Sequence, residues 1–159
     1  MSSHQCYLKG HLILREGVTE DQVKEAFQKF TAWIDERFEE LVGDAIAFEA
    51  DQNLLLDIPF WCSGGHHQDE LDELAVVLGT LCEGEDWIEQ HDIQTGDSEA
   101  ALIPYFIGAT PELRLFARRK YGLLQAQTWL EPILGKEAFA SVRSFVGSLP
   151  LLDAHSVDA

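Results

Sequence analysis

Two spacings of apolar residues recur along this chain, and each predicts one type of secondary structure. Alternation of apolar and polar positions, rich in β-branched and large side chains, is typical of strands that bury one face. Short polar breaks separate pairs of these stretches, and their residue types favour hairpin turns. On this basis we predict strands over residues 6–15, 44–51, 53–60, 86–94 and 100–107.

Apolar residues spaced by three and four positions predict the helices. Thr19 and Gln22 form a capping-box pattern, so the first helix should begin there and continue unbroken to just before Gly43. Thr110 followed by Pro111 predicts another strong helix start, and Pro132 is expected to stop that helix. The predicted helices cover about residues 20–41, 69–82, 111–130 and 136–146.

The predicted order of elements, β-α-β-β-α-β-β-α-α, indicates an α+β fold. Its first six elements match the βαββαβ order of a ferredoxin-like core, in which two helices pack on one face of an antiparallel sheet. An extra strand and two C-terminal helices would complete a single α+β domain over residues 1–146. The C-terminal tail, residues 147–159, should be frayed and disordered, or docked only through Leu149, Leu151 and Leu152.

One proline constrains the predicted sheet. Pro59 lies inside an apolar run that otherwise predicts a strand. Because proline cannot donate a hydrogen bond to a neighbouring strand, this strand should either end at Pro59 or lie at a sheet edge.

The charge of the chain is large and uneven. The 159 residues carry a formal net charge of -17 and 46% of them are hydrophobic, so we expect a packed core beneath a charged surface. Residues 38–113 contain 18 Asp and Glu and no Lys or Arg. Because phosphate backbones and anionic membranes are bound chiefly through Lys and Arg, direct binding to nucleic acid or to a membrane is disfavoured.

The cysteines and the hydropathy pattern bear on the compartment. Cys6, Cys62 and Cys82 are an odd and low number, which indicates reduced thiols and not a disulfide framework. No apolar run approaches the ~18–20 residues that span a bilayer, and the N-terminus lacks a signal-peptide pattern. We therefore expect a cytoplasmic protein.

One short stretch has residue types that ligate metals: Cys62, His66, His67, Asp69 and Glu70. A structural zinc site takes four ligands in two closely spaced pairs, and the second pair is missing here. His66 and His67 are therefore weak candidates for metal ligands, and simple exposure at a helix start is the favoured interpretation. We expect no metal and no cofactor.

Candidate catalytic residues are few. Glu49, Asp51 and Asp57 lie on or beside predicted strands, but acids that alternate with apolar residues are typical of the wet face of a sheet. No G-x-S-x-G motif is present, and no lysine follows Gly64-Gly65 as in a phosphate-binding loop. We expect no catalytic residues and no enzymatic activity.

The sequence has one basic cluster: Arg114, Arg118, Arg119 and Lys120. Two interpretations are open, since the cluster could neutralise the acidic sheet within the molecule or could be a second contact site. The first is favoured, because nearby cations relieve the self-repulsion of a strongly negative fold.

The favoured function is an acidic cytoplasmic binding protein that inhibits or neutralises a basic protein partner, such as a nuclease or another toxin. Its carboxylates would occupy positions of phosphates, as in immunity proteins and nucleic-acid mimics, and their field would speed association. This likeness is functional, because no family motif stands out. Aromatic anchors inside a charged rim are typical of interfaces. The expected partner-binding residues are Trp61, Asp69, Glu70, Asp72, Glu73, Glu85, Asp86, Trp87, Glu89 and Asp92.

Other functions stay open, and so does the oligomeric state. The chain could be a small enzyme, or a small-ligand or metal-binding domain, that uses the region from His66 to Glu70. It could also be a subunit of a homo-oligomer, which an exposed apolar patch around Tyr105 and Phe106 or Trp129 would favour.

Overall fold

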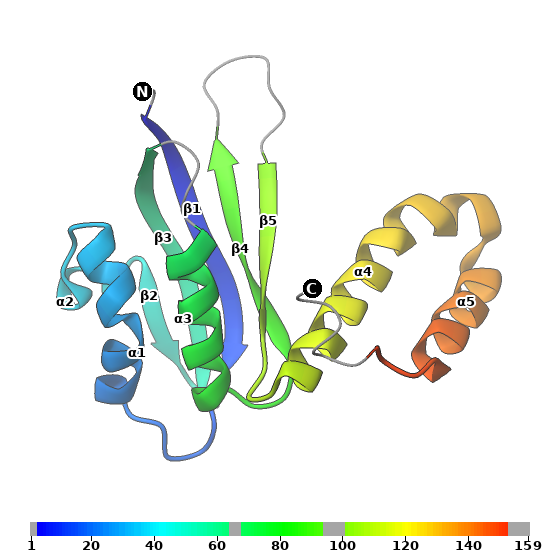
Figure 1. The fold of residues 1–159 in the computed structure, drawn as a ribbon, viewed down its shortest axis with the longest axis horizontal. Helices are drawn as coiled ribbons and strands as arrows, with labels where there is room; N and C mark the ends of the chain where they lie inside the picture. Colours follow the sequence, from blue (N-terminus) through cyan, green and yellow to red (C-terminus); the bar gives the residue numbers. More distant parts are fainter. Residues whose placement is uncertain (1–2, 64–67, 94–100, 153–159) are drawn as a thin grey trace.

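The computed structural model describes residues 3–63, 68–93 and 101–152, and within them the fold is α+β (Figure 1). A five-stranded antiparallel sheet contains β1 (Ser3–Ile13), β2 (Ile46–Glu49), β3 (Asn53–Ser63), β4 (Asp86–Ile93) and β5 (Ala101–Ile107). The helices of these residues are α1 (Glu20–Trp33), α2 (Phe38–Leu41), α3 (Gln68–Leu81), α4 (Pro111–Leu134) and α5 (Lys136–Ser148). The predicted α+β class and antiparallel sheet are confirmed.

The central strand of the sheet is β1, in the order β2-β3-β1-β4-β5. It pairs with β3 along its whole length, from Ser3 opposite Ser63 to Ile13 opposite Asn53. On its other side it pairs with β4, and all the pairs in the sheet are antiparallel. The observed order does not by itself confirm the predicted ferredoxin-like core.

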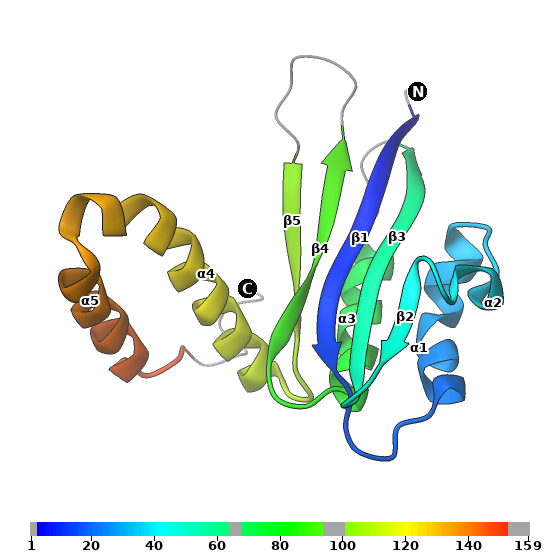
Figure 2. The same ribbon diagram turned by 180° about the vertical axis from the view of Figure 1, so that it is seen from behind.

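Helices α1 and α3 cover one face of the sheet, while the opposite face of β1, β2 and β3 is left open (Figure 1, Figure 2). The alternation along β1 explains the two faces, because Leu8 and Leu12 are fully buried whereas Lys9 and His11 are exposed. Burying each such leucine contributes about 1.5–3 kcal/mol. The buried side chains of α1 and α3 that complete this core are Val23, Phe27, Phe30, Leu71, Leu74, Ala75 and Leu78.

The first predicted helix is interrupted, which corrects the expectation of one element to Leu41. The Thr19 capping box forms as predicted, but α1 ends at Trp33. Asp35 then takes a left-handed backbone conformation with φ of 56°, which aspartate tolerates better than most residues. The short helix α2 follows and returns Phe38 to the core. The apolar spacing therefore continues across a break that it does not reveal.

Strand β3 continues through Pro59, so the expectation that it ends there is wrong. The alternative, an edge position, is correct for this part of β3, because β2 does not extend as far as Pro59. Pro59 lies opposite Tyr7 of β1. On the other side of β3, β2 pairs only with residues 53–56, and the Asp57 amide donates to the Ala45 carbonyl oxygen at 2.8 Å. The Pro59 nitrogen lies on that same side, beyond β2, so no hydrogen bond between these strands is lost.

Two glycines bring α3 close to the end of β5. A Cβ atom added to Gly79 of α3 would lie 2.5 Å from the carbonyl oxygen of Gly108. Gly108 itself packs against the start of α4, and a Cβ atom added to it would lie 2.7 Å from Cβ of Leu113. Side chains at either position would push α3, β5 and α4 apart.

The two C-terminal helices form a hairpin that extends away from the sheet (Figure 1, Figure 2). We call residues up to Ala109 the body and residues 110–152 the arm. The Thr110 cap forms as predicted, whereas α4 runs through Pro132, which corrects the expected stop. The helix ends instead at Gly135, whose φ of 85° a side chain would disfavour.

The arm is joined to the body through aromatic contacts, and the chain after α5 is held against α4. Tyr121 of α4 packs edge-on against Trp87 and Phe106, with ring centroids 5.3 and 5.8 Å apart. After α5, the Leu149 carbonyl oxygen accepts a hydrogen bond from Arg119 at 2.8 Å. The predicted tail is thus docked at its beginning, and residues 153–159 lie outside the described residues.

None of the helices in the described part of the chain combines the length and the apolar character needed to span a bilayer.

Candidate functional site

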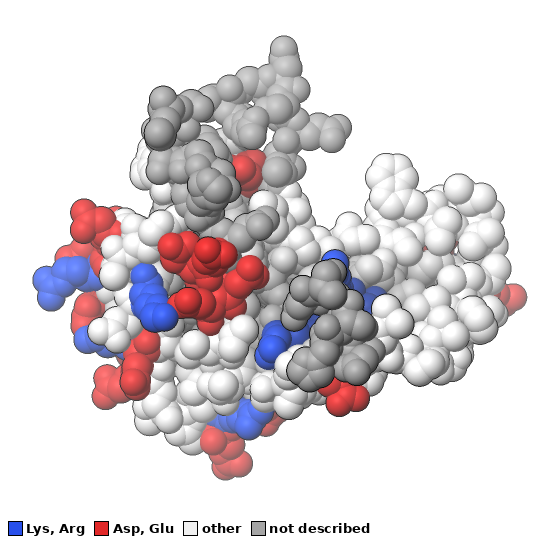
Figure 3. Space-filling view, in the orientation of Figure 1, with Lys and Arg blue, Asp and Glu red and all other residues white. Residues whose placement is uncertain are grey.

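Four carboxylates lie in the first turns of α3, and we call Asp69, Glu70, Asp72 and Glu73 the α3 acidic cluster. Asp69 and Glu70, in the first turn, complement the positive end of the helix dipole, each contributing about 0.3–1 kcal/mol. Because Leu71 and Leu74 take the buried side of the helix, the acids lie outside the core. In Figure 3 a compact group of acidic side chains covers α3 in the middle of the helix-covered side.

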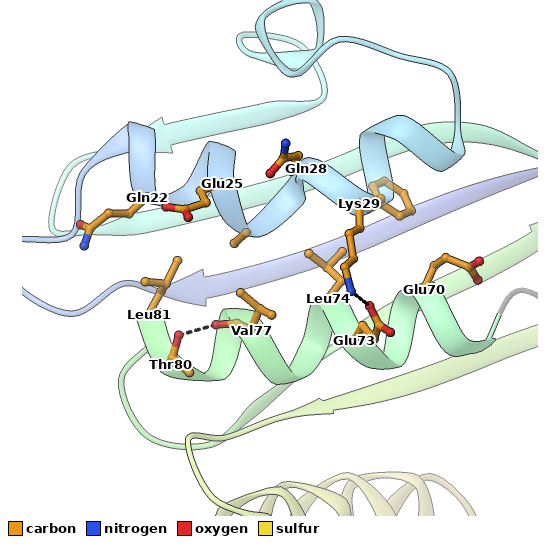
Figure 4. A pocket seen from close by; sticks show the side chains of 12 residues that line it. Gln22, Glu25, Gln28, Lys29, Glu70, Glu73, Leu74, Val77, Thr80 and Leu81 are labelled. Carbon is orange, nitrogen blue, oxygen red and sulfur yellow. Dashed lines mark hydrogen bonds and ion pairs between the residues drawn. The ribbon is translucent and has the colours of Figure 1, made fainter.

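A groove of about 410 Å³ runs between α1 and α3 beside this cluster (Figure 4). Leu74, Val77 and Leu81 of α3 give it an apolar lining. Its acidic lining comes from both helices, with Glu25 on α1 and Glu70 and Glu73 on α3.

Lys29 is the one Lys or Arg among the residues that line this groove. Its Nζ donates to Glu73 Oε2 at 2.7 Å, which links α1 to α3 (Figure 4). Both side chains are more than half exposed, so the pair contributes at most about 1 kcal/mol to stability. A competing cation from another molecule could displace Lys29 at little energetic cost.

The electrostatics of the α3 acidic cluster show excess negative charge. Partial burial raises the pKa of Asp72, and the neighbouring carboxylate of Asp69 raises it further. One carboxylate oxygen of Glu70, Oε2, is buried without a hydrogen-bond partner in the described structure. A donor or cation supplied by a ligand would relieve both unfavourable terms.

The remaining predicted partner-binding residues do not join this cluster. Glu85 and Asp86 are half-buried near the start of β4, at the opposite end of α3. Burial raises the pKa of Asp86, which the Trp87 backbone N–H and the charges of Lys120 and His11 partly oppose.

Trp61, Trp87 and Glu89 lie on the sheet face away from α1 and α3. Trp61 is 68% exposed, whereas its neighbour Phe60 is buried against Phe30. Trp87 is partly covered by Tyr121, and its indole Nε1 donates to Glu89 Oε1 at 3.1 Å. Trp87 is therefore a contact between body and arm, so its ring is only partly accessible to a partner.

Asp92 is buried, which corrects its expected place on a contact surface. Its Oδ1 accepts a hydrogen bond from the Cys6 thiol at 3.2 Å. Gln90, on the same face of β4, accepts a hydrogen bond from the Tyr105 hydroxyl at 3.0 Å. These residues form a polar group between the sheet and the helices, so Asp92 contributes to the internal structure.

The ten predicted residues thus lie in four separate places: on α3, at the start of β4, on the sheet face away from α1 and α3, and, for Asp92, in the interior. Alternation along β4 is the reason, because it sends Glu89 to one face and Asp92 to the other. The acidic surface that the structure does assemble is the α3 acidic cluster with Glu25 across the groove.

No protein-family model matches the chain, and no curated protein or solved structure matches it either. The interpretation of the site therefore depends on its own residues.

The metal and catalytic candidates have different outcomes. His66, His67 and the side chain of Cys62 lie outside the described residues. Among the residues that are described, no group of three or more His, Cys, Asp or Glu could hold a metal ion. Glu49 is exposed beside the turn that contains Asp51.

Asp57, the third of the catalytic candidates, lies on the open face of the sheet. Its Oδ1 is 3.9 Å from Lys9 Nζ, and both side chains are about half exposed or more. This is an ordinary cross-strand ion pair, so the three acids are distributed along β2, its turn and β3 and are not gathered in a pocket.

The basic cluster of α4 contacts carbonyl groups and aromatic rings. Arg114 donates to the Gly108 carbonyl oxygen at 3.0 Å, and Arg119 donates to that of Leu149. Arg118 lies over the ring of Phe106, and Lys120 lies over that of Trp87 at 5.9 Å. The contacts of Arg114, Arg118 and Lys120 tie the arm to the body, whereas the hydrogen bond of Arg119 lies within the arm. Lys120 also favours the ionised form of Asp86.

Sequence reasoning missed Glu25 and Lys29. Both lie on the exposed side of the amphipathic helix α1, opposite the buried Val23 and Phe27. That exposure could be read from the sequence, but nothing in the sequence indicates that this side faces α3.

Proposed function

We propose that the protein is an acidic binding protein that inhibits or neutralises a basic protein partner, such as a nuclease or another toxin acting on nucleic acid. The observation that supports this best is the α3 acidic cluster beside an apolar groove. A partner would place Lys or Arg side chains against Asp69, Asp72 and Glu73, and an apolar side chain against Val77 and Leu81.

The charge of the body supports this function through the rate of association. Residues 1–109 contain 23 acids and five Lys or Arg, a net charge of -18. Such a field accelerates encounter with a basic protein by about 10- to 1000-fold. An inhibitor that must act before a toxin cleaves its target would benefit from this acceleration. The apolar groove lining would then slow dissociation, because interface affinity comes mainly from desolvated anchors.

The test begins with capture of partners from a native lysate by immobilised protein, at low and at high salt, followed by mass spectrometry. The retained basic protein is then purified, and its association rate constant is measured with two double variants. Asp72→Lys with Glu73→Lys reverses the α3 acidic cluster. Glu16→Lys with Glu83→Lys changes the net charge equally, but at exposed loop positions near the other end of α3.

We expect the α3 variant to slow association by about tenfold or more, and the control variant to slow it by less than about threefold. Circular dichroism should show that both variants keep the fold. Equal effects of the two variants would mean that only the net charge matters, and a lysate without any retained basic protein would contradict the proposed function.

Catalysis and cofactors have no part in this proposed function, and direct contact with nucleic acid or membranes has none either. A cytoplasmic location is included, and the buried thiol of Cys82 is consistent with it. Burial raises the pKa of the Cys82 thiol to about 12, so this side chain stays protonated at neutral pH.

We also propose a finer fold assignment, in which β1, α1, β2, β3, α3 and β4 correspond to the ferredoxin-like core. It is supported by the central position of β1 between β3 and β4, and by the placement of both helices on one face. On this assignment β5 is an added edge strand, and α2 is an insertion before β2.

A further inference from the structure

The arm exposes eight large apolar side chains to solvent. In α4 only Ala117 is buried, and in α5 only Phe139. Ile133 is 79% exposed and Trp129 is 76% exposed. We call residues 122–152 the distal arm, and its exposed large apolar side chains are Leu124, Trp129, Leu130, Ile133, Leu134, Phe145, Leu149 and Leu152.

One apolar stripe of α4 faces neither the sheet nor α5. Gly122, Ala126, Trp129 and Ile133 follow one another at steps of four, three and four residues, which places them along one side of the helix. Tyr121 takes the side of α4 that packs on the body, and Gln127 takes the side that hydrogen-bonds to Arg143 of α5. The stripe therefore has the spacing of a helix-packing surface but no second helix on it in the described chain.

Two helices alone make a poor core, because each has only one neighbour to cover its apolar side. The arm lies beside the sheet and contacts it near β4 and β5, so the sheet does not supply the missing layer (Figure 1, Figure 2). A second helical hairpin packed on the first would supply it, as in four-helix bundles.

We propose that the distal arm is a dimerisation surface whose partner is the distal arm of a second copy of this chain. The inference is independent of the proposed function of the acidic body. Charge identifies the second copy as the partner. The distal arm up to Leu152 contains two acids, Glu131 and Glu137, and two bases, Lys136 and Arg143, so its charge is balanced. A two-fold symmetric contact needs a surface that complements itself, and a neutral apolar surface does.

The negative charge of the body, in contrast, disfavours a dimer in which the two bodies are in contact. With a net charge of -18, two bodies in contact would repel each other strongly. Pairing of distal arms keeps the bodies at the two ends of the dimer. A basic partner, which suits the α3 acidic cluster, would gain little electrostatic attraction from the distal arm, whose charges balance and whose surface in Figure 3 is largely uncharged.

The available area is sufficient for a specific dimer. The eight exposed apolar side chains offer on the order of 500 Å². One side of a standard protein interface buries about 800 Å², of which a little more than half is apolar. The distal arm thus provides the apolar part of such an interface.

Sedimentation velocity of the full chain tests this inference directly. We expect the wild-type protein at about 50 µM to sediment as a dimer. The double variant Trp129→Glu with Ile133→Glu should sediment as a monomer, with its dissociation constant raised by about 100-fold, because four carboxylates would face an apolar interface.

A matched control separates the distal arm from other exposed apolar surfaces. Trp61→Glu changes another highly exposed tryptophan, on the open face of the sheet, and should leave the dimer intact. Circular dichroism and the melting temperature of the dilute variants check that each remains folded. A monomeric wild-type protein, or a dimer that Trp61→Glu dissociates and the distal-arm variant does not, would overturn the inference.

Salt distinguishes this contact from binding through the acidic body. Screening the repulsion between two bodies should leave the dimer unchanged or tighten it between low and high salt. Dissociation of the dimer at high salt would show instead that charges hold the two copies together, and would contradict an apolar arm-to-arm contact.

Discussion

The body and the arm differ in how far they bury their apolar side chains. In the body, two amphipathic helices and one face of a sheet enclose a continuous core that includes Leu8, Phe27 and Leu78, each fully buried. In the arm, α4 and α5 together bury only Ala117 and Phe139. The body therefore has what an independent fold needs, whereas the arm has the composition of one half of an interface.

Charge separates the same two regions. The body carries a net charge of -18, while residues 110–152 contain three acids and six bases, a net charge of +3. The basic side chains of α4 lie close to the body, where Arg114 contacts Gly108 and Lys120 contacts Trp87. The difference suggests two contact surfaces of different chemistry, one electrostatic and one apolar, which can be tested separately.

The largest expected contrast comes from removing one aromatic ring in each region. Phe27→Ala should lower the free energy of unfolding by about 3–5 kcal/mol, because the ring is fully buried in the core and packs against Phe30 of α1 and Phe38 of α2. Trp129→Ala, in dilute solution, should change it by less than about 0.5 kcal/mol. Urea denaturation measures both values, and a large loss for Trp129→Ala in a monomer would show that the arm has a core of its own.

A pair of glycine substitutions should have opposite signs in the two regions. Gly79→Ala forces a Cβ to within 2.5 Å of the Gly108 carbonyl oxygen, so we expect a loss of about 1–3 kcal/mol. Gly122→Ala meets no atom within 4 Å and lies inside α4, so it should stabilise by about 0.5–1 kcal/mol. Thermal unfolding followed by circular dichroism gives the two shifts. Shifts of the same sign would contradict the close contact of α3 with the end of β5.

The smallest expected effect concerns the carboxyl group of Asp86, where body and arm meet. Its pKa is raised in the folded protein, so the folded state binds this proton more tightly than the unfolded state does. The contribution of Asp86 to the stability of the wild-type protein therefore falls as the pH rises through the raised pKa. Asp86→Asn should therefore stabilise the protein at pH 7 by no more than about 1 kcal/mol, allowing for the solvent-exposed part of the group.

The advantage of Asp86→Asn should shrink as the pH is lowered through the raised pKa and vanish below the ordinary value of 3.8. Denaturation curves of both proteins at a series of pH values measure the difference. An advantage that grows toward low pH would show that the carboxylate, and not the protonated acid, is the favoured form.

Local patterns predicted the elements well where the relevant residues are close in sequence. The capping box at Thr19, the Thr110-Pro111 start and the alternation around Leu8 all specify structure within a few residues. The apolar spacing does not reveal the break at Asp35, because Phe38 continues that spacing in a second, short helix. Pro132 predicts a stop that the helix does not make, because a proline in the last turn costs only one backbone hydrogen bond there, and α4 continues to Leu134 before the Gly135 cap.

The candidate site was only partly predictable, because its geometry depends on packing between distant segments. The α3 acidic cluster is contiguous in sequence and was identified. Its counterpart Glu25 was not, since the approach of α1 to α3 is a property of the assembled helix layer. The covering of Trp87 by Tyr121 and the burial of Asp92 beside Cys6 also depend on tertiary contacts.

The most direct measurement of the central claim is the ionic-strength dependence of association between the wild-type protein and the basic partner retained from lysate. If the acidic body captures that partner, the association rate constant should fall by about tenfold or more between 0.02 and 0.5 M salt, while the dissociation rate changes little. An association rate that does not depend on salt would contradict the claim that the acidic body is the partner-binding surface.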